Sequence, residues 1–223
     1  MVSKQRARGD EEKQARRRQI LDEALGLWNE RTFATLTMKE VAARCGLVKG
    51  TLYLYFATKE ELLLALLEEL LGGWFDAVDG VLDAPLGDQE RWDAARVAQE
   101  IGAVTVDRTA LTRLLAIGEG ILEHNISATR ALAYKGMMLA RAGATGARLE
   151  RLLPFLAPGE GVLVLIRVHA LVIGVRQMAD PAPVVREVLA LPEMAPLRVE
   201  FGPALMATLV ALMIGMERER GVR

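Results

Sequence analysis

A short segment gathers side chains that can hydrogen-bond to nucleic acid: Lys49, Thr51, Tyr53 and Tyr55. Lysine can reach a phosphate or a guanine edge, threonine a base edge or methyl group, and the tyrosine hydroxyls suit phosphate oxygens. On a helix these side chains form two outward columns, and Gly50 between them offers no side chain to obstruct a close surface. The pattern predicts a helix that can enter the major groove of DNA.

The same helix, expected over residues 49–56, has an inward face made by Leu52 and Phe56, which lie four residues apart. A tight turn precedes it, and a two-turn helix precedes the turn. Thr37 and Glu40 form a capping box that starts this earlier helix, and Gly46 suits its left-handed stop. Two short helices joined by a turn have the geometry of a helix-turn-helix.

A second capping box spans residues 58–61 and starts a long apolar helix over residues 62–78, which we expect to tie two domains together. Thr37 and Lys59 both lie at helix N-termini, where free amides and the helix dipole attract phosphate. Each of these residues also has a purely structural interpretation. In that interpretation Tyr53 and Tyr55 pack within the protein, Thr37 only caps its helix, and Lys59 is a solvated charge.

Before the short helices, Ile20, Ala24, Leu27 and Trp28 recur at helical spacing and predict a first helix of roughly four turns. Residues 1–60 hold 12 basic and 8 acidic side chains, a net charge of +4, whereas the rest of the 223 residues carry −5. Seven basic residues fall in the first 18 positions, and we interpret residues 1–15 as a flexible basic arm.

Beyond residue 75 the pattern stays helical and no convincing strand is found, so the predicted class is all-α. We expect a helix-turn-helix domain over residues 16–74 and a helical domain over residues 75–223. The later helices are predicted over 91–106, 111–122, 127–153, 161–178 and 203–220. The last two are apolar around much of their circumference, which is typical of helices buried between subunits.

Three stretches together resemble the TetR family of regulators: residues 36–42 (LTMKEVA), 46–56 (GLVKGTLYLYF) and 59–62 (KEEL). The similarity covers roughly residues 14–74. It implies backbone roles for Gly46 and Gly50, whereas Val48 departs from a serine that is frequent in the family at that position. It also implies DNA-contact roles for Thr37, Lys49, Thr51, Tyr53, Tyr55 and Lys59.

The resemblance further implies a three-helix DNA-binding domain joined to a helical bundle that dimerises and usually encloses an inducer pocket. We predict a homodimer through residues 161–178 and 203–220 that binds a near-palindromic double-stranded DNA operator. Such a protein is expected to act as a repressor that a small-molecule inducer releases, with no cofactor.

Polar groups within the apolar helices are the candidates for a ligand pocket. Arg176 and His169 share one helix face, and Arg176 either meets an acidic ligand or pairs with Glu119 or Glu123. Tyr134, Met137 and Met138 either line an adaptable apolar cavity or are simple core.

Catalytic and metal sites are not expected. The sequence lacks a P-loop, a dinucleotide fingerprint, a nucleophile elbow and a His-Glu-x-x-His motif, and it has two histidines. Paired Glu-x-x-His motifs are absent, and Cys45 is the single cysteine. The apolar stretches 162–175 and 204–216 are too short for a bilayer, so we predict a soluble cytoplasmic protein.

Two further functions stay open. A helical ligand carrier with a vestigial helix-turn-helix is one, suggested by Val48 and the modest local charge. The other is a dimeric DNA-binding regulator whose core is solid and takes no inducer.

Overall fold

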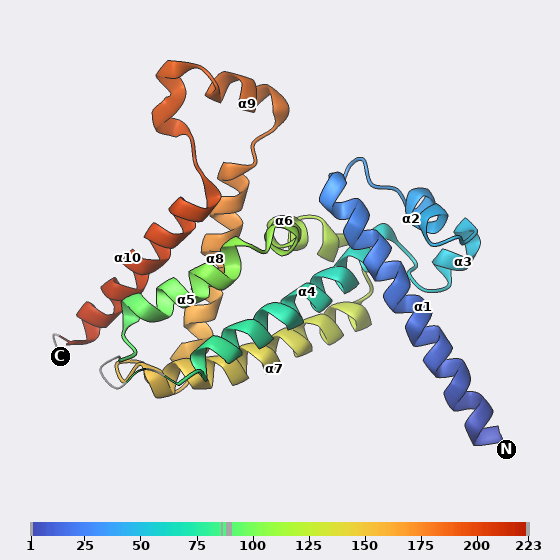
Figure 1. Ribbon diagram of the computed structural model, residues 1–223, viewed down its shortest axis with the longest axis horizontal. Helices are drawn as coiled ribbons and strands as arrows, with labels where there is room; N and C mark the ends of the chain where they lie inside the picture. The colour runs from blue at the N-terminus through green and yellow to red at the C-terminus, as the bar shows by residue number, and fades with distance from the viewer. Residues whose placement is uncertain (1, 86, 88–90, 222–223) are drawn as a thin grey trace. The chain divides into compact units, whose positions relative to one another are not determined.

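The computed structural model describes residues 2–85, 87 and 91–221, with side chains from residue 10 onward (Figure 1). No strand occurs among these residues, which confirms the predicted all-α class. The chain divides into two compact units, the first comprising Met1–Glu69 and Ile117–Ala131 and the second Leu70–Ala116 and Leu132–Arg223. Residues 117–131 thus belong to the first unit, although the predicted first domain ended at residue 74.

In chain order, the helices are α1 (Val2–Glu30), α2 (Met38–Arg44), α3 (Lys49–Tyr53), α4 (Lys59–Leu82), α5 (Ala94–Val106), α6 (Thr109–Gly118), η1 (Leu122–Asn125), α7 (Ala128–Leu152), α8 (Glu160–Ala179), α9 (Pro183–Leu189), η2 (Pro192–Leu197) and α10 (Phe201–Gly221). The two η elements are 3₁₀ helices. Compared with the sequence prediction, α6 ends earlier, at Gly118, and α9 was not predicted at all.

The core of the first unit contains the inner face that the sequence predicted for α1. Ile20, Ala24, Leu27 and Trp28 are all buried. Helix α1 contacts α2, and α2 contacts α3. The buried stripe therefore anchors α1, on which α2 packs.

The N-terminal part of α1 begins earlier than the predicted first helix. The backbone of residues 2–15, expected as a flexible arm, is helical and continuous with the rest of α1. Lys, Arg, Gln, Glu and Ala are good helix formers, so a polar tract can extend a helix whose later turns are anchored in a core. The side chains of Lys4, Arg6 and Arg8 lie outside the described residues.

Helix α4 is long, as predicted, and passes from the first unit into the second between Glu69 and Leu70. Its first half buries leucines on several sides, among them Leu62, Leu64 and Leu67. A helix that is apolar around its circumference is a core helix. In the first unit its centre also pairs with α7, because Glu68 accepts two hydrogen bonds from Arg130.

In the second unit, α4 and α7 run side by side in the same direction (Figure 1). Ion pairs join Asp76 to Arg141, Asp79 to Arg148 at 3.5 Å, and Asp83 to Arg148 at 2.9 Å. The residue numbers of both partners rise together along these pairs, which establishes the parallel arrangement. The acidic partners all come from the α4 segment and the basic partners all come from α7.

A buried hydrogen-bond chain joins α4 to α5. The indole Nε1 of Trp74 donates to the Thr105 hydroxyl at 2.9 Å, and that hydroxyl donates to the Ile101 carbonyl at 2.6 Å. Every polar atom of the chain thereby has a partner in the core, which avoids the cost of burying it unpaired. Helix α5 also packs on α10, where Gly102 lies against the Met206 side chain.

Helices α7 and α8 approach each other through glycines. A Cβ atom added to Gly161 would lie 2.1 Å from the Gly146 carbonyl oxygen, and one added to Gly146 would lie 2.8 Å from the backbone nitrogen of Val162. Glu150 of α7 strengthens this junction, because its carboxylate accepts hydrogen bonds from the amides of Gly159 and Gly161 at 2.8 and 2.9 Å. The start of α8 is thus capped by α7.

Helices α8 and α10 are longer than the apolar stretches seen in the sequence. They contain 20 and 21 residues, and their most apolar windows have mean hydropathies of 1.7 and 1.3, which suffices by length and composition to cross a bilayer. The prediction that they are too short is therefore wrong as a statement of length. Core helices of soluble proteins pass the same test, so the finding does not indicate membrane insertion.

The glycine junction between α7 and α8 gives a stability prediction. Gly146→Ala should destabilise the fold by about 1–3 kcal/mol, because the new methyl group overlaps the backbone of α8. Gly143→Ala, three residues earlier in the same helix with no neighbour within 4 Å of the added Cβ, should be neutral or stabilising by up to about 1 kcal/mol. Urea unfolding followed by circular dichroism measures both, and equal effects would contradict the close approach.

Candidate nucleic-acid interface

The interface begins at the N-terminus of α2, where the predicted capping box is confirmed. The Thr37 hydroxyl accepts a hydrogen bond from the Glu40 amide at 3.3 Å, and a Glu40 carboxylate oxygen accepts from the Thr37 amide at 3.1 Å. These two bonds satisfy amides that a helix start otherwise leaves unpaired. Thr37 itself is exposed to solvent.

The turn between the short helices depends on one glycine. Gly46 has a φ of +65°, in the left-handed region predicted from the sequence. The turn is closed by hydrogen bonds from the Gly46 amide to the Ala43 carbonyl at 3.1 Å and from the Leu47 amide to the Ala42 carbonyl at 2.8 Å. This reversal sets the direction in which α3 leaves α2.

Helix α3 is shorter than predicted. Its regular part ends at Tyr53, and hydrogen bonds from the amides of Tyr55 and Phe56 to the Leu52 carbonyl continue it as a turn. Val48 occupies the N-cap position and is 74% exposed, but its side chain makes no capping hydrogen bond. The departure noted in the sequence therefore leaves the start of α3 without a side-chain cap.

The two faces of α3 are as predicted. Leu52 and Phe56 are buried, whereas Lys49 and Tyr53 are exposed. The Lys49 ammonium lies 5.5 Å from the centre of the Tyr53 ring, a cation–π contact between residues one turn apart. Gly50 is exposed, and Thr51 and Tyr55 are half-buried. Most of the predicted contact residues thus lie on one short exposed element.

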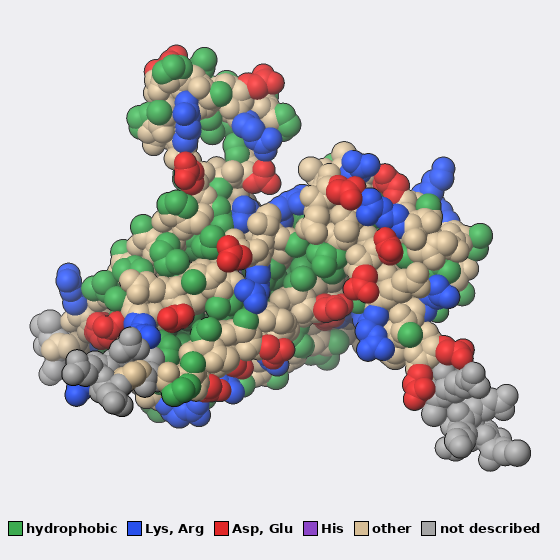
Figure 2. All heavy atoms as spheres, viewed as in Figure 1, with side chains coloured by type: hydrophobic (Ala, Val, Ile, Leu, Met, Phe, Trp, Pro, Cys, Tyr) green, Lys and Arg blue, Asp and Glu red, His purple; other side chains and the backbone are tan. Residues whose placement is uncertain are grey.

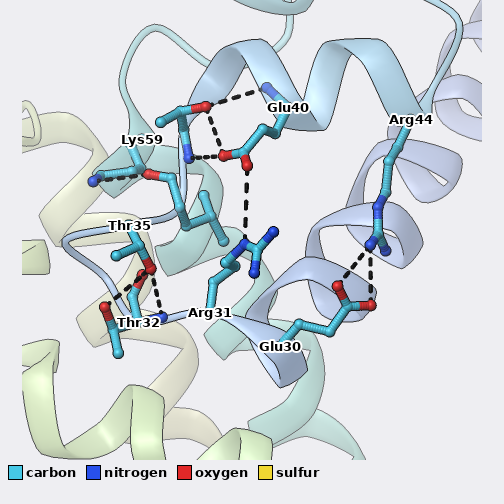
Figure 3. Close-up of polar contacts among 9 residues, drawn as sticks. Glu30, Arg31, Thr32, Thr35, Glu40, Arg44 and Lys59 are labelled. Atoms are coloured by element: carbon cyan, nitrogen blue, oxygen red, sulfur yellow. Dashed lines mark hydrogen bonds and ion pairs between the residues drawn. The ribbon is translucent and has the colours of Figure 1, made fainter.

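Lys59, at the start of α4, is engaged with the loop that precedes α2 (Figure 3). Its ammonium donates to the carbonyls of Phe33 and Leu36 at 2.6 and 3.2 Å, and it lies 3.9 Å from the centre of the Phe33 ring. An ammonium has three N–H donors, so these bonds leave one for the phosphate contact that the sequence predicted. Nothing in the sequence pattern pointed to the two carbonyl partners.

Ion pairs connect α2 to the end of α1 and the residue that follows it (Figure 3). Arg44 pairs with Glu30 at 2.8 Å, and Arg31 lies 3.9 Å from Glu40. The pKa of Glu40 is lowered from its ordinary value, chiefly by the hydrogen bond from the Thr37 hydroxyl and further by the positive charges of Arg31 and Arg44. Glu40 is therefore held in its ionised, cap-forming state.

A hollow of about 670 Å³ lies between α1 and the turn that follows α3. Its lining includes Lys13 and Arg16 of α1 together with Tyr55, and Arg16 donates to the Gln19 side chain at 2.7 Å. In the sequence, Lys13 and Arg16 belong to the basic N-terminal tract, and their position beside Tyr55 was not predicted. Only the long helical α1 brings them there.

The predicted ligand residues fall in both units. Glu119 is exposed and Glu123 half-buried in the first unit. In the second unit Tyr134 is buried, and Met137, Met138, His169 and Arg176 are half-buried.

Arg176 has the most distinctive surroundings among them. Its guanidinium carbon lies 3.5 Å from the centre of the Phe201 ring, so it stacks on the first residue of α10. Burial lowers the pKa of Arg176, the nearby charge of Arg113 lowers it further, and Asp180 opposes this. Arg176 therefore lies near one negative and one positive charge inside the second unit.

Comparison with known proteins covers both units. Residues 20–66 match the family described as "Bacterial regulatory proteins, tetR family", and residues 68–220 match "Tetracyclin repressor-like, C-terminal domain". The chain belongs to the TetR family. It is a transcriptional regulator of that family with a DNA-binding helix-turn-helix, and the family consists of regulators rather than enzymes.

Solved structures of other regulators share the fold. The fatty acid degradation regulator FadR from Bacillus halodurans has a TM-score of 0.58 at 16% identity, covering 90% of this chain and 95% of that one. A transcriptional regulator from Rhodococcus sp. Rha1 has a TM-score of 0.54 at 16% identity, covering 89% and 96%. FadR from Bacillus subtilis, solved in complex with stearoyl-CoA, has a TM-score of 0.50 at 17% identity, covering 87% and 96%.

A curated relative matches in sequence over a shorter range. The HTH-type transcriptional regulator YerO of Bacillus subtilis (strain 168) is 37% identical over 57 residues, which is 26% of this chain and 20% of that protein. The sequence similarity to this relative thus covers only a short part of either chain.

The capping box of this TetR regulator predicts a pH-dependent stability. Because the folded-state pKa of Glu40 lies below its ordinary value of 4.5, ionised Glu40 stabilises the fold above that value, and the contribution disappears as pH falls through the lowered pKa. Thr37→Ala removes the main cause of the shift. Its urea midpoint should lie below that of the wild type near neutral pH, and the gap should narrow in acid.

The control for this experiment is Thr129→Ala, which alters an exposed threonine in the first turn of α7. Its difference from the wild type should not vary with pH in the same range. A gap for Thr37→Ala that stays constant from neutral to strongly acidic pH would show that Glu40 is not held ionised by the cap.

Proposed function

We propose that this TetR regulator is a homodimeric cytoplasmic repressor that binds a near-palindromic operator and is released from it by a small molecule. The observation that carries the DNA-binding part is the α3 surface. Lys49, Gly50 and Tyr53 are exposed on a helix whose opposite side, Leu52 and Phe56, is buried. A rigidly seated helix with an exposed polar side is what major-groove recognition requires.

In this proposal the predicted contact residues divide by chemistry. Lys49 and Thr51 reach base edges or the adjacent phosphate, while the hydroxyls of Tyr53 and Tyr55 bind phosphate oxygens. Thr37 and Lys59 lie at the N-termini of α2 and α4, where the helix dipole favours a phosphate on either side of the groove. Phosphate contacts make the affinity depend on salt.

The proposed dimer forms through the predicted segments 161–178 and 203–220, which correspond to α8 and α10. Each helix presents an outward stripe at three- and four-residue spacing, formed in α8 by Leu163, Ile166, Ala170 and Gly174, and in α10 by Ala207, Ala211 and Gly215. The stripes carry no charge, and their small residues allow two helices to pack closely. A two-fold dimer presents two recognition helices about one DNA turn apart.

The first experiment is selection of genomic DNA fragments on the purified protein, followed by titration of the recovered site at several salt concentrations. A near-palindromic site should be enriched, and its affinity should fall steeply with salt. Lys49→Met should weaken binding and reduce the salt slope by about 1, as loss of one phosphate contact does. Lys59→Met should change the slope less, because two of its donors serve the protein itself.

Lys135→Met, which removes an exposed lysine of α7, is the matched control and should leave both affinity and slope unchanged. Failure to recover any site at low salt would reject operator binding and favour the ligand-carrier alternative. If a site is recovered but Lys49→Met has no effect on its affinity, the proposed contact surface on α3 is wrong and DNA binding itself stands.

For the inducer, we propose an amphipathic molecule with an acidic group that Arg176 binds. The support is the partly buried guanidinium of Arg176, which stacks on Phe201 and has Arg113 as well as Asp180 as charged neighbours. Tyr134, Met137 and Met138 of α7 are proposed to line the apolar part, since methionine adapts to irregular ligands. His169 shares the Arg176 helix, and the roles of Glu119 and Glu123 stay predictions.

Stearoyl-CoA, present in the Bacillus subtilis FadR complex, is the first probe of this ligand class. It should bind in calorimetry and weaken operator binding, and Arg176→Met should reduce its affinity about tenfold, as loss of a charge-assisted contact does. Arg151→Met, at an exposed arginine of α7, is the control.

The result of that titration separates the alternatives. Equal ligand binding by the wild type and Arg176→Met would remove Arg176 from the site. Operator binding that no small acidic amphiphile alters would favour a regulator without an inducer.

A further inference from the structure

The segment between α8 and α10, residues 180–199, forms a lobe that projects beyond the ends of both helices (Figure 1). It contains α9 and η2, and neither element buries a single residue. Apolar side chains lie exposed on its surface instead, among charged and other side chains (Figure 2). Val184 is 67% exposed, Val188 47% and Leu197 65%, and Val185 and Leu191 are exposed as well. Several exposed apolar side chains on one part of a protein surface are typical of an interaction site.

Hydrogen bonds and prolines nevertheless give the lobe a defined structure. The Arg198 guanidinium donates to the carbonyls of Leu189, Ala190 and Leu191, and so satisfies the C-terminal end of α9. Arg186 donates to the Asp180 carboxylate at 3.0 Å. Prolines in both α9 and η2 further restrict the backbone. The lobe has no core of its own. Its shape is therefore maintained by these polar interactions, and its apolar side chains remain exposed.

The composition of the lobe favours a protein surface as the occupant. Residues 180–199 carry three acidic and two basic side chains and no aromatic residue. A net charge of −1 does not attract nucleic acid or an anionic membrane surface. Membrane-binding elements also rely on Trp or Tyr at the interface, which the lobe lacks.

The position of the lobe identifies the protein partner as a second copy of this chain. The lobe joins α8 directly to α10, the two helices whose outward stripes form the proposed dimer interface. Its apolar surface continues into α8 through Met178, which is exposed at the helix end. A hollow of about 380 Å³, lined by Met178, Leu189 and Val199 among others, lies where the lobe meets α8. We propose that the lobe packs against the partner subunit and enlarges the dimer interface.

This inference rests on the proposed α8 and α10 dimer, so the test separates the two. The variant Val184→Ser/Val188→Ser changes exposed side chains only and should leave the helical signal in circular dichroism unchanged. Sedimentation equilibrium of the full-length protein should show a dimer dissociation constant at least about tenfold higher than that of the wild type. Leu139→Ser, at a leucine of α7 that is 69% exposed, is the matched control and should not change it.

Ala211→Arg places a charge in the α10 stripe and should yield monomers. If it does and the valine variant dimerises like the wild type, the lobe inference is wrong and the helix interface stands. If Ala211→Arg remains dimeric with unchanged affinity, the α8 and α10 interface itself is wrong, and the valine variant then reports on the lobe independently.

Photocrosslinking identifies the contact directly. Benzoylphenylalanine is introduced at position 188, and isotopically heavy and light protein are mixed, allowed to exchange subunits and irradiated. Crosslinked peptides that join heavy to light chains are expected. Crosslinks confined to single chains would overturn the proposal.

Discussion

The DNA-binding surface depends on the burial of Leu52 and Phe56. A helix of five residues has no stability of its own in water, because nucleating a helical turn fixes more dihedral angles than one hydrogen bond repays. Helix α3 therefore depends on the burial of its inner side chains in the first unit, where Ile20 and Trp28 of α1 are buried as well. The orientation of Lys49 and Tyr53 is consequently a property of the whole first unit, although the residues themselves form one short stretch of sequence.

Polar interactions then fix the ends of the short helices and their connections, which burial alone does not determine. The Thr37–Glu40 cap determines where α2 starts, and the left-handed Gly46 determines where it ends. Lys59 ties the start of α4 to the loop before α2. Individually such contacts contribute little free energy. Together they restrict the short helices to one arrangement, which is what a surface that reads DNA by hydrogen bonds needs.

The sequence predicted most of what local patterns determine. The inner stripe of α1, the cap at Thr37, the left-handed Gly46 and the two faces of α3 follow from spacing and residue type. The helical state of residues 2–15 could not be predicted in this way, because a polar tract is compatible both with a flexible arm and with the extension of an anchored helix. Lys59 bonds to carbonyls 26 and 23 residues away, and Lys13 approaches Tyr55 only through the fold. Contacts between distant segments carry no signature in one sequence.

The ion pairs between α4 and α7 have a consequence for how the chain finds its fold. Since α4 contributes only carboxylates to these pairs and α7 only guanidinium groups, two copies of α4 or two copies of α7 repel each other along this seam. Sliding one helix past the other by a turn separates several pairs at once. The charges therefore discriminate among alternative pairings and registers of two long helices, a role that their small contribution to stability would not reveal.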